Sequence, residues 1–179
     1  MTAVLIDRFI PRFDHVERHR VHVQSTPERA YAALRGVDLG RSGLIRLLFG
    51  VRGIRRTRRI TLDDLLRRGF VLLGEEPGEE VVLGIVGRFW TPSGGVVSVE
   101  PGDFTTFDEP GYAKAAWNFR IRPAWEGSCL VTTETRILCT DDRSRRTFRR
   151  YWRVVRPFSG SVRRRALHLV KRQAEGPAP

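Results

Sequence analysis

The pattern that most constrains the fold lies near the end of the chain. Apolar residues recur every three or four positions across residues 143–174, which predicts one long amphipathic helix. Its apolar stripe consists of Phe148, Tyr151, Trp152, Val155, Phe158, Val162, Ala166, Leu169 and Val170. Pro157 interrupts the pattern and predicts a kink, because proline removes a backbone donor and crowds the preceding turn. A stripe of this length needs a broad apolar surface to cover.

The segments before this helix predict that surface. Strands are predicted at residues 17–24, 70–74, 79–90, 103–107, 112–122 and 130–140. After the first strand, short helices are predicted between Ser25 and Gly36, at residues 42–49 and between Thr61 and Gly69. The first of them has a capping box formed by Ser25 and Glu28. A run of strands followed by one helix favours an α+β fold, with a curved antiparallel sheet wrapped around the long C-terminal helix.

The charge of the chain is concentrated in the same helix. The formal net charge is +12, and residues 143–172 hold 12 basic residues and no acidic one. The rest of the chain has as many acidic as basic residues, and residues 52–59 form a second basic segment. An arginine-rich surface of this kind binds a polyanion, either a nucleic acid or an anionic membrane, or is an ordinary solvated face. We rank the solvated face first and contact with an anionic surface or nucleic acid second, since the apolar stripe is needed to close the sheet and is not free to enter lipid.

Several classes of protein are excluded or disfavoured. The longest apolar run, residues 81–87, is far shorter than the ~20 residues that a membrane helix needs. Residues 1–10 lack the basic start and apolar middle of a signal peptide, so we expect a cytoplasmic protein. Cys129 and Cys139 fall ten residues apart on one predicted strand, ~33 Å from each other, and should remain free thiols.

The histidines near the start of the chain do not predict a metal site. His15, Glu17 and His19 share one face of a strand, but His15 and His19 would lie ~13 Å apart, too far for one metal ion. The chain also has no four-ligand zinc pattern. His168 lies on the long helix and is expected to be exposed or partly covered. We therefore predict no metal and no cofactor.

The order of elements resembles the START-like or SRPBCC superfamily, which has a helix-grip fold. The resemblance spans residues 14–174 and rests on the segment Ser25-Thr26-Pro27-Glu28-Arg29-Ala30-Tyr31, the run of strands and the closing helix with Tyr151-Trp152. Four further segments are similar to an uncharacterised bacterial subgroup: Gly87-Arg88-Phe89-Trp90, Pro110-Gly111-Tyr112-Ala113, Trp117-Asn118-Phe119 and Thr133-Glu134-Thr135-Arg136. The length of the chain predicts one START-like domain over residues 1–179, with a core at about residues 14–174 and residues 175–179 as a frayed tail.

The superfamily resemblance also implies a cavity between the sheet and the helix for an apolar or aromatic small molecule. Its members include lipid carriers, hormone binders and polyketide cyclases. We predict these ligand-binding residues: Arg88, Trp90, Trp117, Phe119, Glu134, Arg136, Tyr151 and Trp152. The aromatic members line the cavity or fill an ordinary core. The sequence leaves open a carrier or sensor and a cyclase or dehydratase that uses the same cavity.

The polar members of this set depend on which face of the last strand is concave. Glu134 and Arg136 are two residues apart and point to the same side, with Arg88 and Asn118 on neighbouring strands. On a concave face they would orient a polar group of a ligand or perform acid–base chemistry on a carbonyl substrate. On a convex face they would be an ordinary ladder of surface charges. The other side of the strand is more apolar, which favours the convex alternative.

Overall fold

The computed structural model of the chain describes residues 4–41 and 60–177. The short helix predicted at residues 42–49 and the basic segment 52–59 lie outside the described residues. The described elements are η1 (Leu5–Arg8), β1 (His15–Val23), α1 (Pro27–Gly36), η2 (Leu39–Arg41), α3 (Leu62–Leu66), β2 (Val71–Glu76), β3 (Glu80–Gly87), β4 (Ala113–Pro123), β5 (Cys129–Cys139) and α4 (Asp142–Glu175). No helix in these ranges is both long and apolar enough to span a membrane.

The strands form one antiparallel sheet of five strands in the order β1-β5-β4-β3-β2. Five of the six predicted strands are therefore present, each close to its predicted position. The prediction of a strand at residues 103–107 is wrong, because this segment forms turns. Phe104 of the segment is fully buried, and it lies so close to Gly84 that a Cβ there would come within 2.9 Å of its ring. The buried ring of Phe104 and a hydrogen bond of 2.8 Å from Lys114 Nζ to the carbonyl of Thr105 hold this loop on the sheet.

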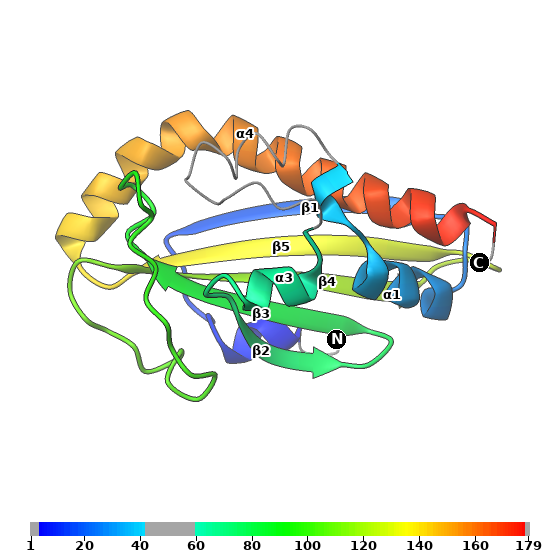
Figure 1. The fold of residues 1–179 in the computed structure, drawn as a ribbon, viewed down its shortest axis with the longest axis horizontal. Helices are drawn as coiled ribbons and strands as arrows, with labels where there is room; N and C mark the ends of the chain where they lie inside the picture. Colours follow the sequence, from blue (N-terminus) through cyan, green and yellow to red (C-terminus); the bar gives the residue numbers. More distant parts are fainter. Residues whose placement is uncertain (1–3, 42–59, 178–179) are drawn as a thin grey trace.

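The long helix α4 covers one face of the sheet, as the helix-grip prediction requires. It packs on β1 and β5, and α1 packs against both α4 and β4. Figure 1 shows α4 lying along the sheet and bending near its middle, where Pro157 falls within the helix. Asp141 caps its first turn by accepting a hydrogen bond from the backbone N–H of Ser144 at 2.9 Å. The helix continues through Glu175, so that residue does not belong to a frayed tail.

The cap of α1 differs in detail from its prediction. The N-cap is Thr26, whose hydroxyl accepts from the backbone N–H of Arg29, and Ser25 is buried one residue before it. Pro27 in the first turn is compatible with an N-cap at Ser25 or at Thr26. The backbone N–H that proline lacks would have no partner within the helix at that position. The helix predicted to start at Thr61 is confirmed, since Thr61 is the N-cap of α3 and forms a reciprocal capping box with Asp64.

The opposite face of the sheet is covered by the N-terminal segment, which the sequence prediction placed outside the core. Leu5, Ile6 and Ile10 are buried against Val82 and Val86 of β3. The sheet is therefore covered on both faces. Charged residues that are buried between this segment and the sheet, such as Glu80 and Arg136, have to be paired within the protein.

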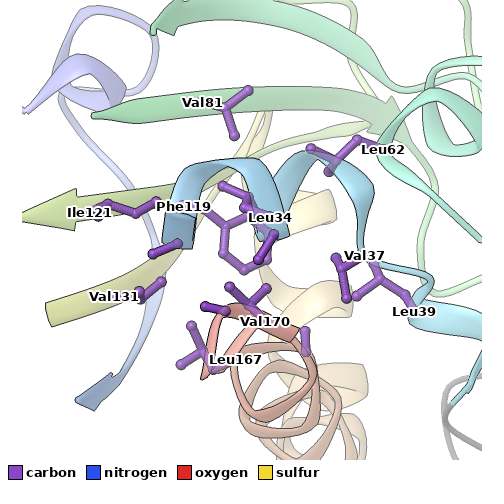
Figure 2. Packing of buried hydrophobic residues seen from close by; sticks show 14 of the residues in the cluster. Leu34, Val37, Leu39, Leu62, Val81, Phe119, Ile121, Val131, Leu167 and Val170 are labelled. Carbon is purple, nitrogen blue, oxygen red and sulfur yellow. The ribbon is translucent and has the colours of Figure 1, made fainter. Parts of the chain in front are cut away.

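The largest hydrophobic cluster joins α1, α3 and the C-terminal half of α4 to the sheet. Figure 2 shows Leu34 of α1 and Val170 of α4 meeting Phe119 of β4. Cys129 belongs to this cluster, and both cysteines are buried and free, as predicted. Burial raises the pKa of the Cys139 thiol to about 12, which keeps it protonated at neutral pH.

Candidate functional site

The layer between the sheet and α4 contains two separate apolar clusters. One joins Leu167 and Val170 of α4 to Phe119 and Val131 of the sheet. The other surrounds Phe148, near the start of α4, and includes Ala113, Ile137 and Cys139. Residues of β5 that face α4 alternate along the strand, so Thr133 and Thr135 fall between Val131 and Ile137. The two clusters are therefore separated by polar side chains.

We refer to these polar side chains as the polar belt, which consists of Glu17 and His19 of β1, Thr133 and Thr135 of β5, and Ser159 and Arg163 of α4. The strand register places Glu17 beside Thr135 and His19 beside Thr133. Two hydrogen bonds connect the belt to the helix: Ser159 Oγ donates to Glu17 Oε2 at 3.0 Å, and Arg163 Nε donates to Thr135 Oγ1 at 2.5 Å. The belt thus runs from strand to helix across the interior layer.

Arg163 is the positively charged member of the belt. Its Cζ lies 5.2 Å from the ring centroid of Trp117, in a cation–π arrangement. Burial lowers the pKa of the Arg163 guanidinium to about 10, and the negative charge of Glu17 opposes that shift. The guanidinium nevertheless stays protonated at neutral pH. Among the described residues, its only hydrogen bond is the one from Nε to Thr135.

Glu17 and His19 are held close to α4 because the helix has no side chain at Gly160. The Glu17 and His19 side chains are only 10% and 14% exposed, and His19 Nε2 lies 3.3 Å from Glu17 Oε1. That contact does not have hydrogen-bond geometry, so His19 Nε2 is a buried polar atom with no hydrogen-bond partner among the described residues. Such an atom is costly in a dry interior.

Trp117 is fixed by a short chain of hydrogen bonds. Its Nε1 donates to Thr133 Oγ1 at 2.6 Å, and the Thr133 hydroxyl donates to the backbone carbonyl of Asn118, also at 2.6 Å. The neighbouring ring of Phe119 has its centroid 4.8 Å away. Two of the predicted ligand-binding residues, Trp117 and Phe119, therefore face α4 with the indole in a defined orientation.

Three other predicted residues gather around Phe148 at the other end of the layer. The ring centroids of Trp90, Tyr151 and Trp152 lie 6.2, 5.6 and 5.6 Å from that of Phe148. His15 completes the group, with its ring centroid 5.2 Å from Phe148. The five predicted aromatic residues thus lie in two groups, one on each side of the polar belt.

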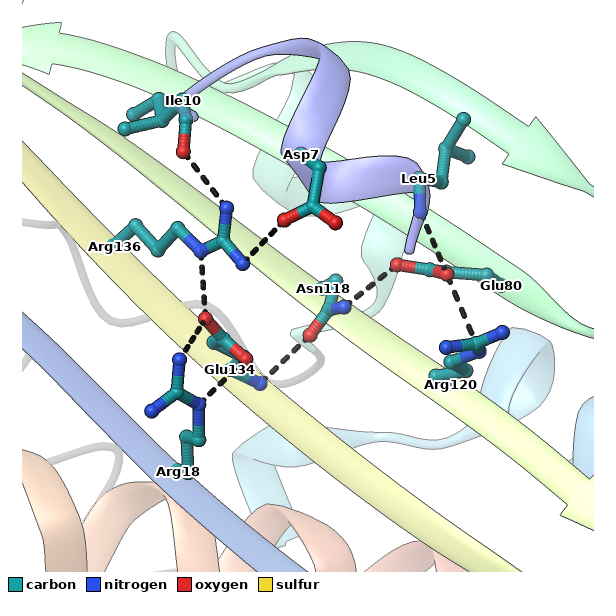
Figure 3. Close-up of polar contacts among 9 residues, drawn as sticks. All are labelled: Leu5, Asp7, Ile10, Arg18, Glu80, Asn118, Arg120, Glu134 and Arg136. Carbon is teal, nitrogen blue, oxygen red and sulfur yellow. Dashed lines mark hydrogen bonds and ion pairs between the residues drawn. The ribbon is translucent and has the colours of Figure 1, made fainter. Parts of the chain in front are cut away.

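Glu134 and Arg136 lie on the opposite face of the sheet, beneath the N-terminal segment. Figure 3 shows that Arg136 donates to Glu134, to Asp7 and to the carbonyl of Ile10. Glu134 also accepts two hydrogen bonds from Arg18, at 2.8 and 3.0 Å. These two residues therefore do not face the layer between the sheet and α4. The alternative in which Glu134 and Arg136 lie on the concave face, where they would contact a ligand, is therefore wrong.

The remaining contacts extend this network across the sheet. Asn118 accepts from the backbone N–H of Glu134 at 2.7 Å and donates to Glu80 at 2.6 Å. Glu80, which is fully buried, accepts in turn from the backbone N–H of Leu5 at 3.1 Å. The network extends over four strands, β1, β5, β4 and β3, and it holds the N-terminal segment on the sheet through Glu80 and Arg136.

The protonation state of Glu134 follows from this network. Burial opposes its negative charge, but the hydrogen bonds from Arg18 and Arg136 outweigh burial and lower the pKa of the carboxyl. Arg88, the third polar residue of the predicted set, is exposed and lies with its Cζ 4.4 Å from the ring centroid of Tyr112. The structure therefore does not bring Arg88 together with Glu134 and Arg136.

Sequence reasoning missed the polar belt as a unit. It counted Arg163 among the solvated arginines and considered Glu17 and His19 only as metal ligands. One signal was present: Arg163 lies four residues after Ser159 and three before Ala166, on the stripe that faces the sheet. Within the described ranges, no three His, Cys, Asp or Glu side chains gather closely enough to hold a metal ion.

No protein-family model matches the chain, and the comparison with curated proteins found no significant match. Among solved structures, 12 chains match. The protein TTHA0849 from Thermus thermophilus is 11% identical, with 89% of this chain and 97% of that chain covered and a TM-score of 0.36. The protein Ara h 8.0201 is 10% identical, with 87% and 97% covered and a TM-score of 0.31.

A third match is the Zhui aromatase/cyclase from Streptomyces sp. R1128. It is 13% identical, with 89% of this chain and 94% of that chain covered and a TM-score of 0.32. The three matches extend over most of this chain and of each matched chain. The likeness is one of fold. The ligand or activity of this chain has to be argued from its own residues.

Proposed function

We propose that this protein binds a small apolar or aromatic molecule in the layer between the sheet and α4, as a carrier or sensor. The observation that carries the proposal is the polar belt, which lies between two apolar clusters rather than at the surface. Small-molecule sites combine mostly apolar and aromatic walls with a few placed polar groups. A layer that served packing alone would gain more stability from aliphatic residues at these positions.

The aromatic residues on either side of the belt fit such a ligand. Trp117 is oriented by its hydrogen bond to Thr133, and Phe148 has several rings around it. Aromatic faces give a planar ligand a large contact area at a low cost in conformational entropy. The predicted binding residues retained in the proposal are Trp90, Trp117, Phe119, Tyr151 and Trp152.

The proposal is tested with a neutral fluorescent probe, N-phenyl-1-naphthylamine, titrated into the full-length protein. We expect saturable binding of one probe per chain. Trp117→Leu should weaken binding severalfold, whereas Trp125→Leu, which alters a tryptophan that is 70% exposed, should not. Thermal unfolding of both variants shows whether they remain folded at the temperature of the titration. Non-saturable binding, or equal effects of the two substitutions, would contradict the proposal.

A cyclase or dehydratase on the same fold was the first alternative from the sequence. In that alternative, the polar groups that position the substrate are Glu134, Arg136 and Arg88. Two of these hold the N-terminal segment to the sheet, and the third is exposed beside Tyr112. Since no specific contact among the described residues favours turnover, we do not propose this activity.

A specific feature of α4 favours a second candidate function, binding to an anionic bilayer. Val154 and Phe158 lie one helical turn apart and are 69% and 52% exposed. Arg150 and Arg153 beside them are exposed as well. Apolar side chains among cations suit the interface of a membrane, where the apolar side chains enter the acyl boundary and the guanidinium groups meet lipid phosphates. If the helix instead bound the phosphates of a nucleic acid, Val154 and Phe158 would have no role in the contact.

This second candidate is tested by co-sedimentation with vesicles of phosphatidylcholine alone or with phosphatidylglycerol. We expect binding only to the anionic vesicles, and a loss of binding in Phe158→Ser. The control is Val96→Ser, which alters a 44% exposed valine away from α4. Equal binding by both variants would contradict a membrane role, and salt-sensitive binding to DNA but not to vesicles would replace it with a nucleic-acid partner.

A further inference from the structure

The chemistry of the polar belt indicates what kind of polar group the ligand carries. A guanidinium has five N–H donors and no acceptor. Arg163 uses one of them, on Nε, for Thr135. Its side chain lies against Trp117 on one side, in the layer between helix and sheet. The terminal nitrogens make no hydrogen bond or ion pair with any residue in the described ranges, and Arg163 as a whole is half-buried.

The same part of the belt holds a buried polar atom without a hydrogen bond. His19 Nε2 is buried and lacks a hydrogen-bond partner in the described ranges. It lies near the backbone of α4, since a Cβ on Gly160 would be 3.5 Å from it. Thr133 and Thr135, which neighbour His19 and Glu17 in the register, are adjacent positions on one face of β5. One buried atom without a hydrogen bond, His19 Nε2, thus occurs in the same belt as the terminal donors of Arg163, which no described residue engages.

The charge balance of the belt selects a neutral acceptor over an anion. Glu17 interacts electrostatically with Arg163 and is held in place by the hydroxyl of Ser159. A carboxylate ligand at Arg163 would therefore meet the repulsion of Glu17, whereas a carbonyl oxygen would not. A carbonyl oxygen also accepts the two N–H groups that a guanidinium presents together.

We propose that the ligand carries a neutral carbonyl oxygen, which accepts hydrogen bonds from the terminal nitrogens of Arg163 while its apolar body packs beside the belt. This inference rests on the proposed small-molecule function and specifies the class of ligand. His19 Nε2 supplies a second contact to the same polar end of the ligand. Arg163 acts here as a specificity-determining residue, and no chemical step is assigned to it.

The experiment uses three naphthalenes of similar shape: 2-ethylnaphthalene, 2-acetylnaphthalene and 2-naphthoate. Each displaces N-phenyl-1-naphthylamine from the full-length protein at neutral pH. We expect 2-acetylnaphthalene to bind more tightly than 2-ethylnaphthalene by on the order of tenfold, because only the ketone offers an acceptor to the terminal nitrogens of Arg163 and loses its water when it binds. We expect 2-naphthoate to bind less tightly than 2-acetylnaphthalene.

Arg163→Met should remove the preference for the ketone, by lowering the affinity for 2-acetylnaphthalene by on the order of tenfold more than the affinity for 2-ethylnaphthalene. The matched control is Arg165→Met, which alters an exposed arginine of the same helix and should retain the preference. Glu17→Gln, which removes the negative charge from the belt, should raise the affinity for 2-naphthoate relative to 2-acetylnaphthalene. This variant provides an independent readout if Arg163→Met does not fold.

The outcomes separate this inference from the proposed function. If wild-type protein binds all three compounds equally, or if Arg163→Met weakens the ketone and the hydrocarbon by the same factor, the carbonyl inference is overturned while ligand binding stands. If none of the compounds and no neutral probe binds, both are overturned. A tighter affinity for 2-naphthoate in the wild type would replace the carbonyl with an anionic group.

Discussion

Gly160 of α4 lies directly against Glu17 of β1, because a Cβ built on Gly160 would come within 2.6 Å of Glu17 Oε1. The helix and the edge strand therefore meet at this point with no side chain from the helix between them. The close approach lets Ser159, the preceding residue, donate its hydrogen bond to the same carboxylate. The position of the polar belt thus depends on one glycine within a long helix.

Replacing this glycine with a larger residue should separate α4 from β1. We expect Gly160→Val to lower the free energy of unfolding by ~2–3 kcal/mol, since overpacking costs of that order exceed any gain in helix propensity. Gly102→Val is the control, because a Cβ on Gly102 meets nothing within 4 Å. Urea unfolding midpoints measure both. Equal midpoints for the two variants would show that α4 does not approach β1 this closely.

Glu134→Gln should destabilise the fold without affecting ligand binding. We expect a loss of ~1–3 kcal/mol, because Arg136 and Arg18 lose a charged acceptor. The folded-state pKa of Glu134 lies below the ordinary value of 4.5, so the charged form stabilises the fold. The difference between wild type and variant is therefore largest above pH 4.5 and shrinks as the pH falls through the lowered pKa.

Urea unfolding of wild type and Glu134→Gln at several pH values measures that difference. Glu126→Gln, at an exposed position, is the matched control and should change stability little. A difference that grows toward acidic pH would have the wrong sign for a carboxyl whose pKa is lowered by folding. Weaker binding of N-phenyl-1-naphthylamine by the variant would argue that Glu134 contributes to the ligand site after all.

Ile6→Ala tests whether the N-terminal segment is part of the core. Ile6 is fully buried on the face of the sheet opposite α4. We expect a loss of ~2–4 kcal/mol in the free energy of unfolding, from lost burial and the cavity left behind. Val96→Ala removes a smaller apolar side chain from an exposed position and should be nearly neutral. A neutral Ile6→Ala would mean that residues 4–10 do not pack on the sheet.

Asp141→Ala tests the start of α4. The carboxylate accepts from the backbone N–H and the hydroxyl of Ser144, and also from the backbone N–H of Gly111 at 2.5 Å. We expect a loss of ~1–2 kcal/mol, the usual cost of removing an N-cap. Asp141→Asn keeps an acceptor oxygen and should recover part of the loss. Chemical unfolding followed by circular dichroism measures both, and equal stability of Asp141→Ala and wild type would contradict the capping role.

Much of the fold could be predicted because the relevant signals are local. Alternation in residues 112–122 and 130–140 predicted β4 and β5, and the apolar stripe predicted α4 and its place on the sheet. The same reasoning failed at residues 103–107, where the position of Phe104 is set by contacts with distant strands. It also predicted no place in the fold for residues 4–13, because a short apolar segment without periodicity does not indicate which surface it covers.

In the candidate site, too, the locally determined features could be predicted and the contacts between distant residues could not. The sequence by itself determined the element order, the aromatic residues, the two faces of β5 and the excess of positive charge on α4. Only the tertiary structure decided that Glu134 and Arg136 lie under the N-terminal segment and that Arg163 meets Thr135 and Trp117. Local backbone geometry determines which residues share one face of a strand or helix. The partner of a charged side chain depends on which distant strand or helix packs against it.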